Sequence, residues 1–161
     1  MKPEKPTSLD KVRGFIEPAF RRPPFVQAAA LCLREGRGGR EVLLVTSRGS
    51  GRWILPKGWP IKGRSLAGAA LQEAWEEAGV IGHVDEVPLG YYRYSKMRRD
   101  GFGQDCRVEV FRVHVADLVR NWPEGRQRRR RWVALDKAAR LVAEPELADL
   151  FTRLQSRSFP D

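Results

Sequence analysis

Three glutamates stand close together in the segment LPKGWPIKGRSLAGAALQEAWEEAGV, residues 55–80. Glu73, Glu76 and Glu77 are spaced i, i+3 and i+4, which places their side chains on one face of a helix. Carboxylates at this spacing repel each other, so something has to offset the repulsion. One interpretation is a solvated acidic face paired with Lys or Arg. The other is a site where carboxylate oxygens hold a hard divalent cation such as Mg²⁺.

The residues around the glutamates predict the helix that carries them. Apolar side chains recur with helical spacing, at Leu66, Ala67, Ala70, Leu71, Ala74 and Ala78. Ser65 is a typical N-cap, and Gly79 is typical of the residue that ends a helix. Gly58 precedes the helix in the loop PKGWP, where the chain bends closely past it. We therefore expect a backbone carbonyl of this loop to supply a further oxygen ligand.

The rest of the chain predicts strands on both sides of this helix and a helical C-terminal region. Strands are expected at 25–35, 41–48 and 53–56, within 80–97 and 105–118, and at 132–135. Residues 136–157 are expected to form one or two helices, with Asp136 as an N-cap and Pro145 beginning the second. This order of elements predicts an α/β fold, a sandwich around a mixed β-sheet.

Composition is that of one soluble globular domain. The chain has 161 residues, of which 42% are hydrophobic and 31% charged. The first residues contain no apolar run of signal-peptide length, and no stretch is long enough for a membrane span. Cys32 and Cys106 are far apart in apolar segments, so two reduced core thiols are favoured over a disulfide. We expect a cytoplasmic protein, with residues 1–24 as an N-terminal arm because prolines interrupt them.

The charge balance favours anionic partners. Lys and Arg total 30 against 20 for Asp and Glu, which gives a net charge of +10. Such an excess suits nucleic acid, nucleotides, inositol phosphates or anionic membrane, although it can also serve solubility alone. Arg is more abundant than Lys, and its planar guanidinium grips phosphate with two parallel hydrogen bonds.

The segment that contains the three glutamates resembles the signature of the Nudix hydrolase family. That signature runs Gly, five residues, Glu, seven residues, then Arg-Glu-apolar-x-Glu-Glu-x-Gly-apolar. The spacing is complete, and the matching residues are Gly58, Glu73, Glu76, Glu77 and Gly79. Two positions depart from it: Arg64 stands where the family has Glu, and Gln72 where the family has Arg.

The resemblance implies a fold, a reaction and a cofactor. It implies a Nudix-type α/β/α sandwich over residues 25–157 and hydrolysis of a phosphoanhydride bond with Mg²⁺ or Mn²⁺. The carboxylates of Glu73, Glu76 and Glu77 would be catalytic and bind metal, together with the Gly58 carbonyl. The segment DLVRNWPEGRQRRRRWV and the helix after it look like the branch that hydrolyses diadenosine and diphosphoinositol polyphosphates. The partner would be such a phosphorylated small molecule.

Further candidates lie outside the signature. Some relatives use a box glutamate to deprotonate the attacking water and others a carboxylate elsewhere, for which Glu109 and Glu124 are candidates. Surface ion pairs are the alternative role for both. Basic residues in the loops expected at the rim of the site are the candidate phosphate ligands: Arg52, Lys57, Arg93 and Lys96. The arginine run 126–131 could contribute, but alternate residues of a strand point in opposite directions.

The two departures leave alternatives open. Gln72 can donate a hydrogen bond but brings no charge, and Arg64 adds a base near the helix start. Relative to the family signature, the chain lacks an Arg at position 72 and a Glu at position 64. These two could form one ion pair, so that losing both is compensated, or their loss could weaken catalysis. The retained glutamates favour an active enzyme. The alternatives are a 5′-end RNA pyrophosphohydrolase and a Nudix-fold binding protein without turnover. Nucleic acid is thus a less favoured partner, and no membrane partner is expected.

Overall fold

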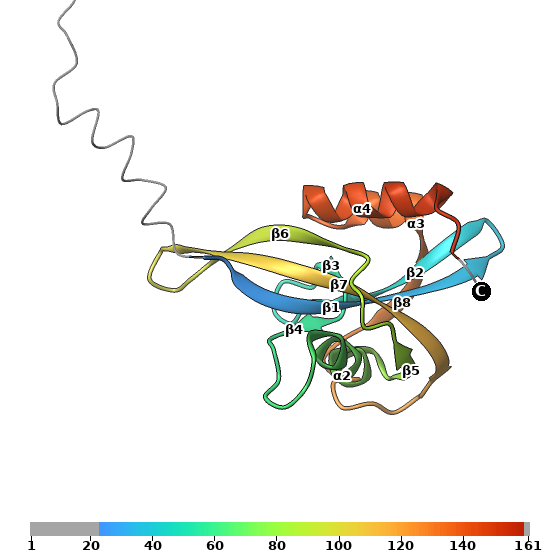
Figure 1. The fold of residues 1–161 in the computed structure, drawn as a ribbon, viewed down its shortest axis with the longest axis horizontal. Helices are drawn as coiled ribbons and strands as arrows, with labels where there is room; N and C mark the ends of the chain where they lie inside the picture. Colours follow the sequence, from blue (N-terminus) through green and yellow to red (C-terminus); the bar gives the residue numbers. More distant parts are fainter. Residues whose placement is uncertain (1–22, 160–161) are drawn as a thin grey trace, which may run out of the picture.

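The computed structural model describes residues 23–159, which form three layers (Figure 1). Helix α2 (Leu66–Ala78) covers one face of a mixed sheet, and helices α3 (Leu135–Leu141) and α4 (Pro145–Ser156) cover the other. The predicted α/β/α sandwich is confirmed. The expected N-terminal arm, residues 1–24, lies outside the described residues except for its last two.

Eight strands build the sheet. They are β1 (Phe25–Gly36), β2 (Gly39–Thr46), β3 (Trp53–Ile54), β4 (Lys57–Gly58), β5 (Val80–Val84), β6 (Gly90–Met97), β7 (Gly103–Leu118) and β8 (Arg130–Ala134). The central pair, β1 and β7, is parallel, and each of the other pairings is antiparallel. The connection between β1 and β7 contains α2, as a parallel pair requires a long crossover.

Strand β1 changes its partner along its length. Its last residues, 33–36, pair with β2, whereas Ala28 and Ala29 pair with Gly58 and Lys57 of β4. Both partners therefore lie on the same edge of β1, one beyond the other. This arrangement brings the start of the crossover, at β4, beside the helix that follows it.

Each face of the sheet has its own core. Ala28, Ala30 and Cys32 face α2, and the residues between them in β1 face α3 and α4. The side of α2 that meets the sheet is built largely from alanines, of which Ala70 and Ala74 are fully buried. Small side chains on both partners let the helix lie close to the sheet. Carboxylates on the flank of α2 can therefore reach the backbone of β4.

Several expected elements differ in detail from the structure. The stretch 80–97 forms two strands, β5 and β6, separated by a turn at 85–89. Lys57 and Gly58 form a short strand rather than a loop, because β1 offers them a partner that the local sequence does not reveal. The prediction of Asp136 as the N-cap of α3 is wrong, because the N-cap is Ala134, two residues earlier, and Asp136 lies in the first turn of the helix. Pro145 begins α4 as predicted.

Both cysteines are free and buried, as predicted. Burial raises the pKa of the Cys32 thiol to about 12, so this thiol is an inert core side chain. Among residues 23–159, no helix is long and apolar enough to cross a membrane.

Candidate metal and phosphate site

Helix α2 has the ends that its sequence predicts. The Ser65 hydroxyl accepts a hydrogen bond from the Gly68 backbone N–H at 3.0 Å, which satisfies one of the free amides of the first turn. Gly79 ends the helix with φ 67°, and its N–H donates to the Trp75 carbonyl at 2.9 Å. Both ends are fixed, so the register of the three glutamates relative to the sheet is fixed too.

Glu77 is the most buried of the three glutamates, and its side chain is 6% exposed. Its Oε1 accepts from Nη2 of Arg128 at 3.1 Å, and its Oε2 accepts from the Lys57 backbone N–H at 3.4 Å. Arg128 is itself buried and also donates to the Thr46 carbonyl at 3.0 Å. The buried carboxylate thus has a charged partner from the segment before β8 and a neutral one from β4.

Glu73 lies directly against Gly58. A Cβ added at position 58 would stand 2.0 Å from Oε1 of Glu73, so only glycine permits this approach. Glu77 lies one helical turn after Glu73 on the same face of α2 and approaches the neighbouring β4 residue Lys57. The structure therefore brings together the β4 backbone at Gly58 and two carboxyl groups of α2.

The surroundings of Glu73 and Glu77 raise the pKa of both carboxyl groups. Burial raises the pKa of Glu73 to about 7 and that of Glu77 to about 8. Arg128 opposes the shift of the Glu77 pKa, whereas the charges of Glu73 and Glu124 add to it. Two closely placed carboxylates favour holding a proton unless a cation replaces it.

Glu76 faces a different partner. Its Oε1 accepts a hydrogen bond from the Gln72 amide at 2.8 Å, one helical turn away. Gln72, the departure from the family signature, therefore binds Glu76, while the guanidinium that reaches Glu77 comes from Arg128. Arg64, the other departure, is exposed in the loop before α2.

The donor set fits a hard divalent cation. Glu73 and Glu77 would supply carboxylate oxygens, and the backbone carbonyl of Gly58, whose Cα side lies against Glu73, would be a further oxygen ligand of the type that Mg²⁺ and Mn²⁺ accept. Within residues 23–159, no three His, Cys, Asp or Glu side chains converge into a ready-made metal cluster. Mg²⁺ usually binds through one or two carboxylates with water and substrate phosphates as its other ligands, and this set suits that mode.

Of the two outside carboxylates, the structure brings Glu124 to the site. Its Oε1 lies 3.4 Å from Nη2 of Arg128, and its backbone N–H donates to the Glu76 carbonyl at 3.0 Å. Glu109 lies two strands away from Gly58, since Ala28 pairs with both residues. This glutamate accepts a hydrogen bond from Nε of Arg107 at 2.8 Å, the ion pair considered as its alternative role.

The four predicted phosphate ligands line one cavity of about 520 Å³. It lies between β1, β3, β4, β6 and the connection from α3 to α4, and its basic residues are Arg52, Lys57, Arg93 and Lys96. Lys57 connects the cavity with the glutamates. Its backbone N–H donates to Glu77, and its Nζ donates to Oη of Tyr94 at 3.3 Å.

The four basic side chains differ in whether a carboxylate of the protein already binds them. Arg93 binds Glu146 of α4, with Nη2 3.1 Å from Oε1 and the backbone N–H 2.9 Å from Oε2. Arg52 lies 3.6 Å from Oε1 of Glu144. Burial lowers the pKa of Lys57, and the charges of Glu77 and Glu144 oppose that shift. The negative charge of a phosphate beside Lys57 would also raise the pKa of Lys57, as these carboxylates do.

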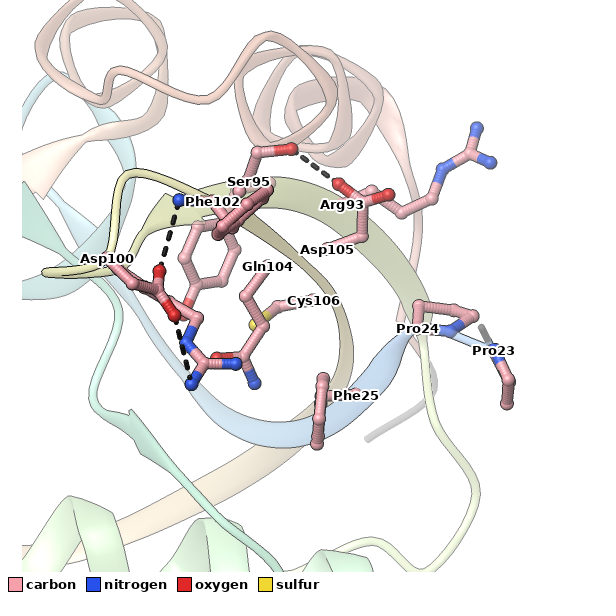
Figure 2. A pocket seen from close by; sticks show the side chains of 13 residues that line it. Pro23, Pro24, Phe25, Arg93, Ser95, Asp100, Phe102, Gln104, Asp105 and Cys106 are labelled. Atoms are coloured by element: carbon pink, nitrogen blue, oxygen red, sulfur yellow. Dashed lines mark hydrogen bonds and ion pairs between the residues drawn. The ribbon is translucent and has the colours of Figure 1, made fainter. Parts of the chain in front are cut away.

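Figure 2 shows a second cavity, which has a larger volume of about 1110 Å³. Pro23, Pro24 and Phe25 line one side of it, and the β6–β7 hairpin lines the other. The Ser95 hydroxyl donates to Oδ1 of Asp105 at 2.6 Å across the two strands of the hairpin. The two cavities share residues 93–95 of β6.

Some residues of the site were not predicted from the sequence. Arg128 lies in a run of arginines, and nothing in the local sequence distinguishes it from its neighbours. Arg130, two residues later, instead donates to the Ala78 carbonyl at 2.7 Å and lies 3.9 Å from the Trp122 ring centroid. Glu144 precedes Pro145 and has no sequence signal for burial, although its side chain is 7% exposed.

Comparisons with known proteins match this architecture. A family model described as a NUDIX domain matches residues 24–154. The chain is 35% identical over 104 residues to "Nudix hydrolase 12, mitochondrial" of Arabidopsis thaliana, covering 63% of this chain and 51% of that protein. It is 30% identical over 138 residues to "Diphosphoinositol polyphosphate phosphohydrolase 3-alpha" of Mus musculus, covering 83% and 80%.

A solved structure shows the same fold. A binary complex of the C. elegans Ap4A hydrolase has a TM-score of 0.60 at 21% identity, covering 81% of this chain and 94% of that one. The chain spans about half the length of the first curated relatives that it matches. The family match includes the α2 glutamates, β4 and the 520 Å³ cavity. The chain therefore belongs to the NUDIX family.

Proposed function

We propose that this chain is a divalent-metal-dependent pyrophosphohydrolase. Its substrate would be a nucleoside-diphosphate-linked or polyphosphorylated small molecule, with dinucleoside and diphosphoinositol polyphosphates favoured. The observation that carries the proposal is the position of Lys57, between the Glu73–Glu77 pair and a cavity lined by basic side chains. The names of the mouse and C. elegans relatives support the same substrate classes.

In this proposal each part of the site has one role. Glu73 and Glu77, with the Gly58 carbonyl, hold Mg²⁺ or Mn²⁺, and Glu76 is a ligand directly or through water. The cation neutralises phosphate oxygens and makes bound water easier to deprotonate. Arg52, Lys57 and Lys96 bind and orient the phosphate chain, whereas Arg93 contributes to the cavity while holding α4 through Glu146.

Hydrolysis then requires one proton acceptor and one leaving phosphate. Water attacks a phosphorus atom, the bond to the bridging oxygen breaks, and the leaving phosphate keeps that oxygen. A carboxylate beside the Glu73–Glu77 pair accepts the proton of the water; Glu76 and Glu124 are the candidates because both adjoin the pair. Lys57 stabilises the negative charge that the phosphates carry as the bond breaks.

We further propose that residues 25–157 form the hydrolase domain, that residues 1–24 are an N-terminal arm and not part of that domain, and that the protein works in the cytoplasm. The family match over 24–154 supports the domain limits. Two free, buried cysteines suit a reducing compartment.

Product release from a substrate panel tests the proposed activity. The panel would contain diadenosine polyphosphates, a diphosphoinositol polyphosphate, nucleoside triphosphates, a nucleotide sugar and 5′-triphosphate RNA, each with Mg²⁺ or Mn²⁺. Glu77→Gln removes a proposed ligand, and Glu86→Gln removes an exposed carboxylate on the turn after β5 as a matched control.

We expect chelator-sensitive turnover of one small-molecule class. Removal of a group that only orients a metal ligand lowers activity roughly 10- to 100-fold. Glu77→Gln removes a proposed ligand itself, so its activity should fall by more than that, whereas Glu86→Gln should retain full activity. Turnover confined to RNA would move the substrate to nucleic acid. Tight binding of a panel member without any turnover would replace the hydrolase with a binding protein.

A further inference from the structure

The two histidines of the chain meet on the sheet. His83 of β5 and His114 of β7 are directly opposite each other in the antiparallel pairing of these strands. Residues in such a pair have their Cβ atoms about 5 Å apart, so their side chains touch. The two imidazole rings are stacked, with 4.5 Å between their centroids and 9° between their planes. The pairing of β5 with β7 thus places side by side two metal-ligand side chains that are far apart in the sequence.

Asp85 holds the ring of His114. Its Oδ1 lies 2.9 Å from Nε2 of His114. A carboxylate only accepts hydrogen bonds, so Nε2 donates this one, and a neutral His114 then carries its free lone pair on Nδ1. A histidine that binds a metal almost always donates its other ring N–H to a carboxylate, a carbonyl or water. His114 therefore has the second partner that a metal-binding histidine needs.

Solutes can reach both rings. His83 is exposed, and the side chain of His114 is 33% exposed. Neither residue lines the 520 Å³ or the 1110 Å³ cavity, so the pair is separate from the proposed substrate site. The part of the chain that the structure describes has no cluster of three His, Cys, Asp or Glu side chains that could hold a metal. A cation at this pair therefore has two protein ligands and completes its coordination with water.

We propose that His83 and His114 together bind one Zn²⁺ ion. Nδ1 of His114 and a ring nitrogen of His83 are the protein ligands, and Asp85 is a positioning residue. Imidazole suits Zn²⁺, whereas Mg²⁺ takes oxygen ligands, so this site and the one proposed on α2 select different cations. The lone pairs of parallel rings do not converge, so the exposed His83 ring turns towards the ion while Asp85 keeps His114 in place. Zinc binding here does not depend on the proposed hydrolysis.

The bound ion links two strands. Strand β5 starts directly after Gly79, the residue that ends α2, and the Gly79 carbonyl accepts a hydrogen bond from the Val119 N–H at 3.0 Å. A ligand that binds only the folded state stabilises it. Zn²⁺ should therefore raise the Tm of the protein, because it ties β7 to the strand that continues from α2.

Titration with Zn²⁺ tests the proposal on protein that carries no histidine tag. Excess Mg²⁺ suppresses binding of Zn²⁺ at the α2 glutamates, and ¹H–¹⁵N spectra of the histidine rings report which nitrogen binds the ion. Because the chain has two histidines, His83→Gln and His114→Gln assign both rings. Asp85→Asn tests the positioning role, and Asp149→Asn, an exposed carboxylate on α4, is the control. Competition with a chelating dye gives Kd, and thermal unfolding in EDTA establishes that each variant is folded.

We expect Zn²⁺ to shift the Nδ1 resonance of His114 and one nitrogen of His83 with the same Kd. Asp85→Asn should weaken binding about 10-fold or more and should redistribute the proton between the two nitrogens of metal-free His114. Each histidine variant should weaken binding further and abolish the rise in Tm with Zn²⁺. Asp149→Asn should behave as wild type.

Three results would overturn parts of this site. Ring nitrogens that stay unshifted at millimolar Zn²⁺ would refute it altogether. Unchanged Zn²⁺ affinity of His114 in His83→Gln would leave a contact with a single histidine and refute the paired site. Weaker binding by Asp85→Asn without any change in the tautomer of His114 would refute the positioning role. None of these measurements uses turnover, so failure of the proposed hydrolase is a separate result.

Discussion

Gln72 and Arg128 each bind one of the glutamates of α2. Gln72, which stands where the family has Arg, binds Glu76 within the helix at 2.8 Å. Arg128, 51 residues beyond Glu77 in the chain, binds Glu77 at 3.1 Å. A guanidinium is therefore present beside the glutamates despite the departure at position 72. We infer that the departure does not by itself abolish catalysis.

Arg128 should contribute most to the stability of the fold when no metal is bound. We expect Arg128→Gln to lower the free energy of unfolding by about 2 kcal/mol in EDTA, because the buried Glu77 carboxyl loses its cation and must take up a proton or stay charged without a partner. Urea denaturation at pH 8 would measure this. Saturating Mg²⁺ should recover part of the loss, since the metal supplies positive charge. Arg131→Gln, an exposed position in the same run, is the control. An equal loss with and without Mg²⁺ would contradict the account.

The raised pKa values of Glu73 and Glu77 predict a pH dependence. A carboxyl group whose pKa is higher in the folded state than in the unfolded state stabilises the fold at low pH. That contribution is lost as pH rises through the folded values, here about 7 and 8. Mg²⁺ binds the deprotonated carboxylates, so the rise in Tm on adding Mg²⁺ should be larger at pH 8.5 than at pH 6. A rise independent of pH, or one unchanged in Glu77→Gln, would argue against these ligands.

At the scale of elements, the site depends on how closely β4 approaches α2. Gly58→Ala would place a methyl group 2.0 Å from Oε1 of Glu73, and the flexible carboxylate would have to move. We expect a folded protein whose affinity for Mn²⁺ falls by about 10-fold or more, comparable with the loss of a residue that orients a metal ligand. Gly38→Ala, where an added Cβ meets nothing within 4 Å, is the matched control. Unchanged Mn²⁺ binding by Gly58→Ala would show that this approach does not shape the site.

The elements also show what the sequence could and could not predict. Ser65 and Gly79 were predictable because capping depends on local residue type. The convergence of Gly58 with Glu73 was implied by a resemblance to a known motif. The burial of Arg128 was not predictable, since its partners Thr46 and Glu77 are 82 and 51 residues away in the chain. Glu144 was missed for the same reason, because only the packing of α4 over the sheet creates the cavity that it lines.

The whole molecule carries a net charge of +10, whereas the proposed metal site is built from the carboxylates of α2. In the proposed function, the basic side chains attract phosphorylated ligands, and the α2 carboxylates attract the cation. Because a nucleotide contacts only a few of these cations, we expect log Kd for ADP to change shallowly with log salt concentration, which calorimetry at several NaCl concentrations would measure. A much steeper slope for 5′-triphosphate RNA, together with tighter binding of RNA, would instead favour a nucleic-acid substrate.

The central claim is that Glu73 and Glu77 hold the divalent cation that the hydrolysis needs. Titration of Mn²⁺ monitored by electron paramagnetic resonance tests it most directly, with wild type, Glu73→Gln, Glu77→Gln and the control Glu86→Gln at pH 8. We predict saturable Mn²⁺ binding by wild type and by Glu86→Gln, with affinity reduced more than about 10-fold in each of the other two variants. Equal Mn²⁺ affinity in all four proteins would place the cation elsewhere and contradict the account.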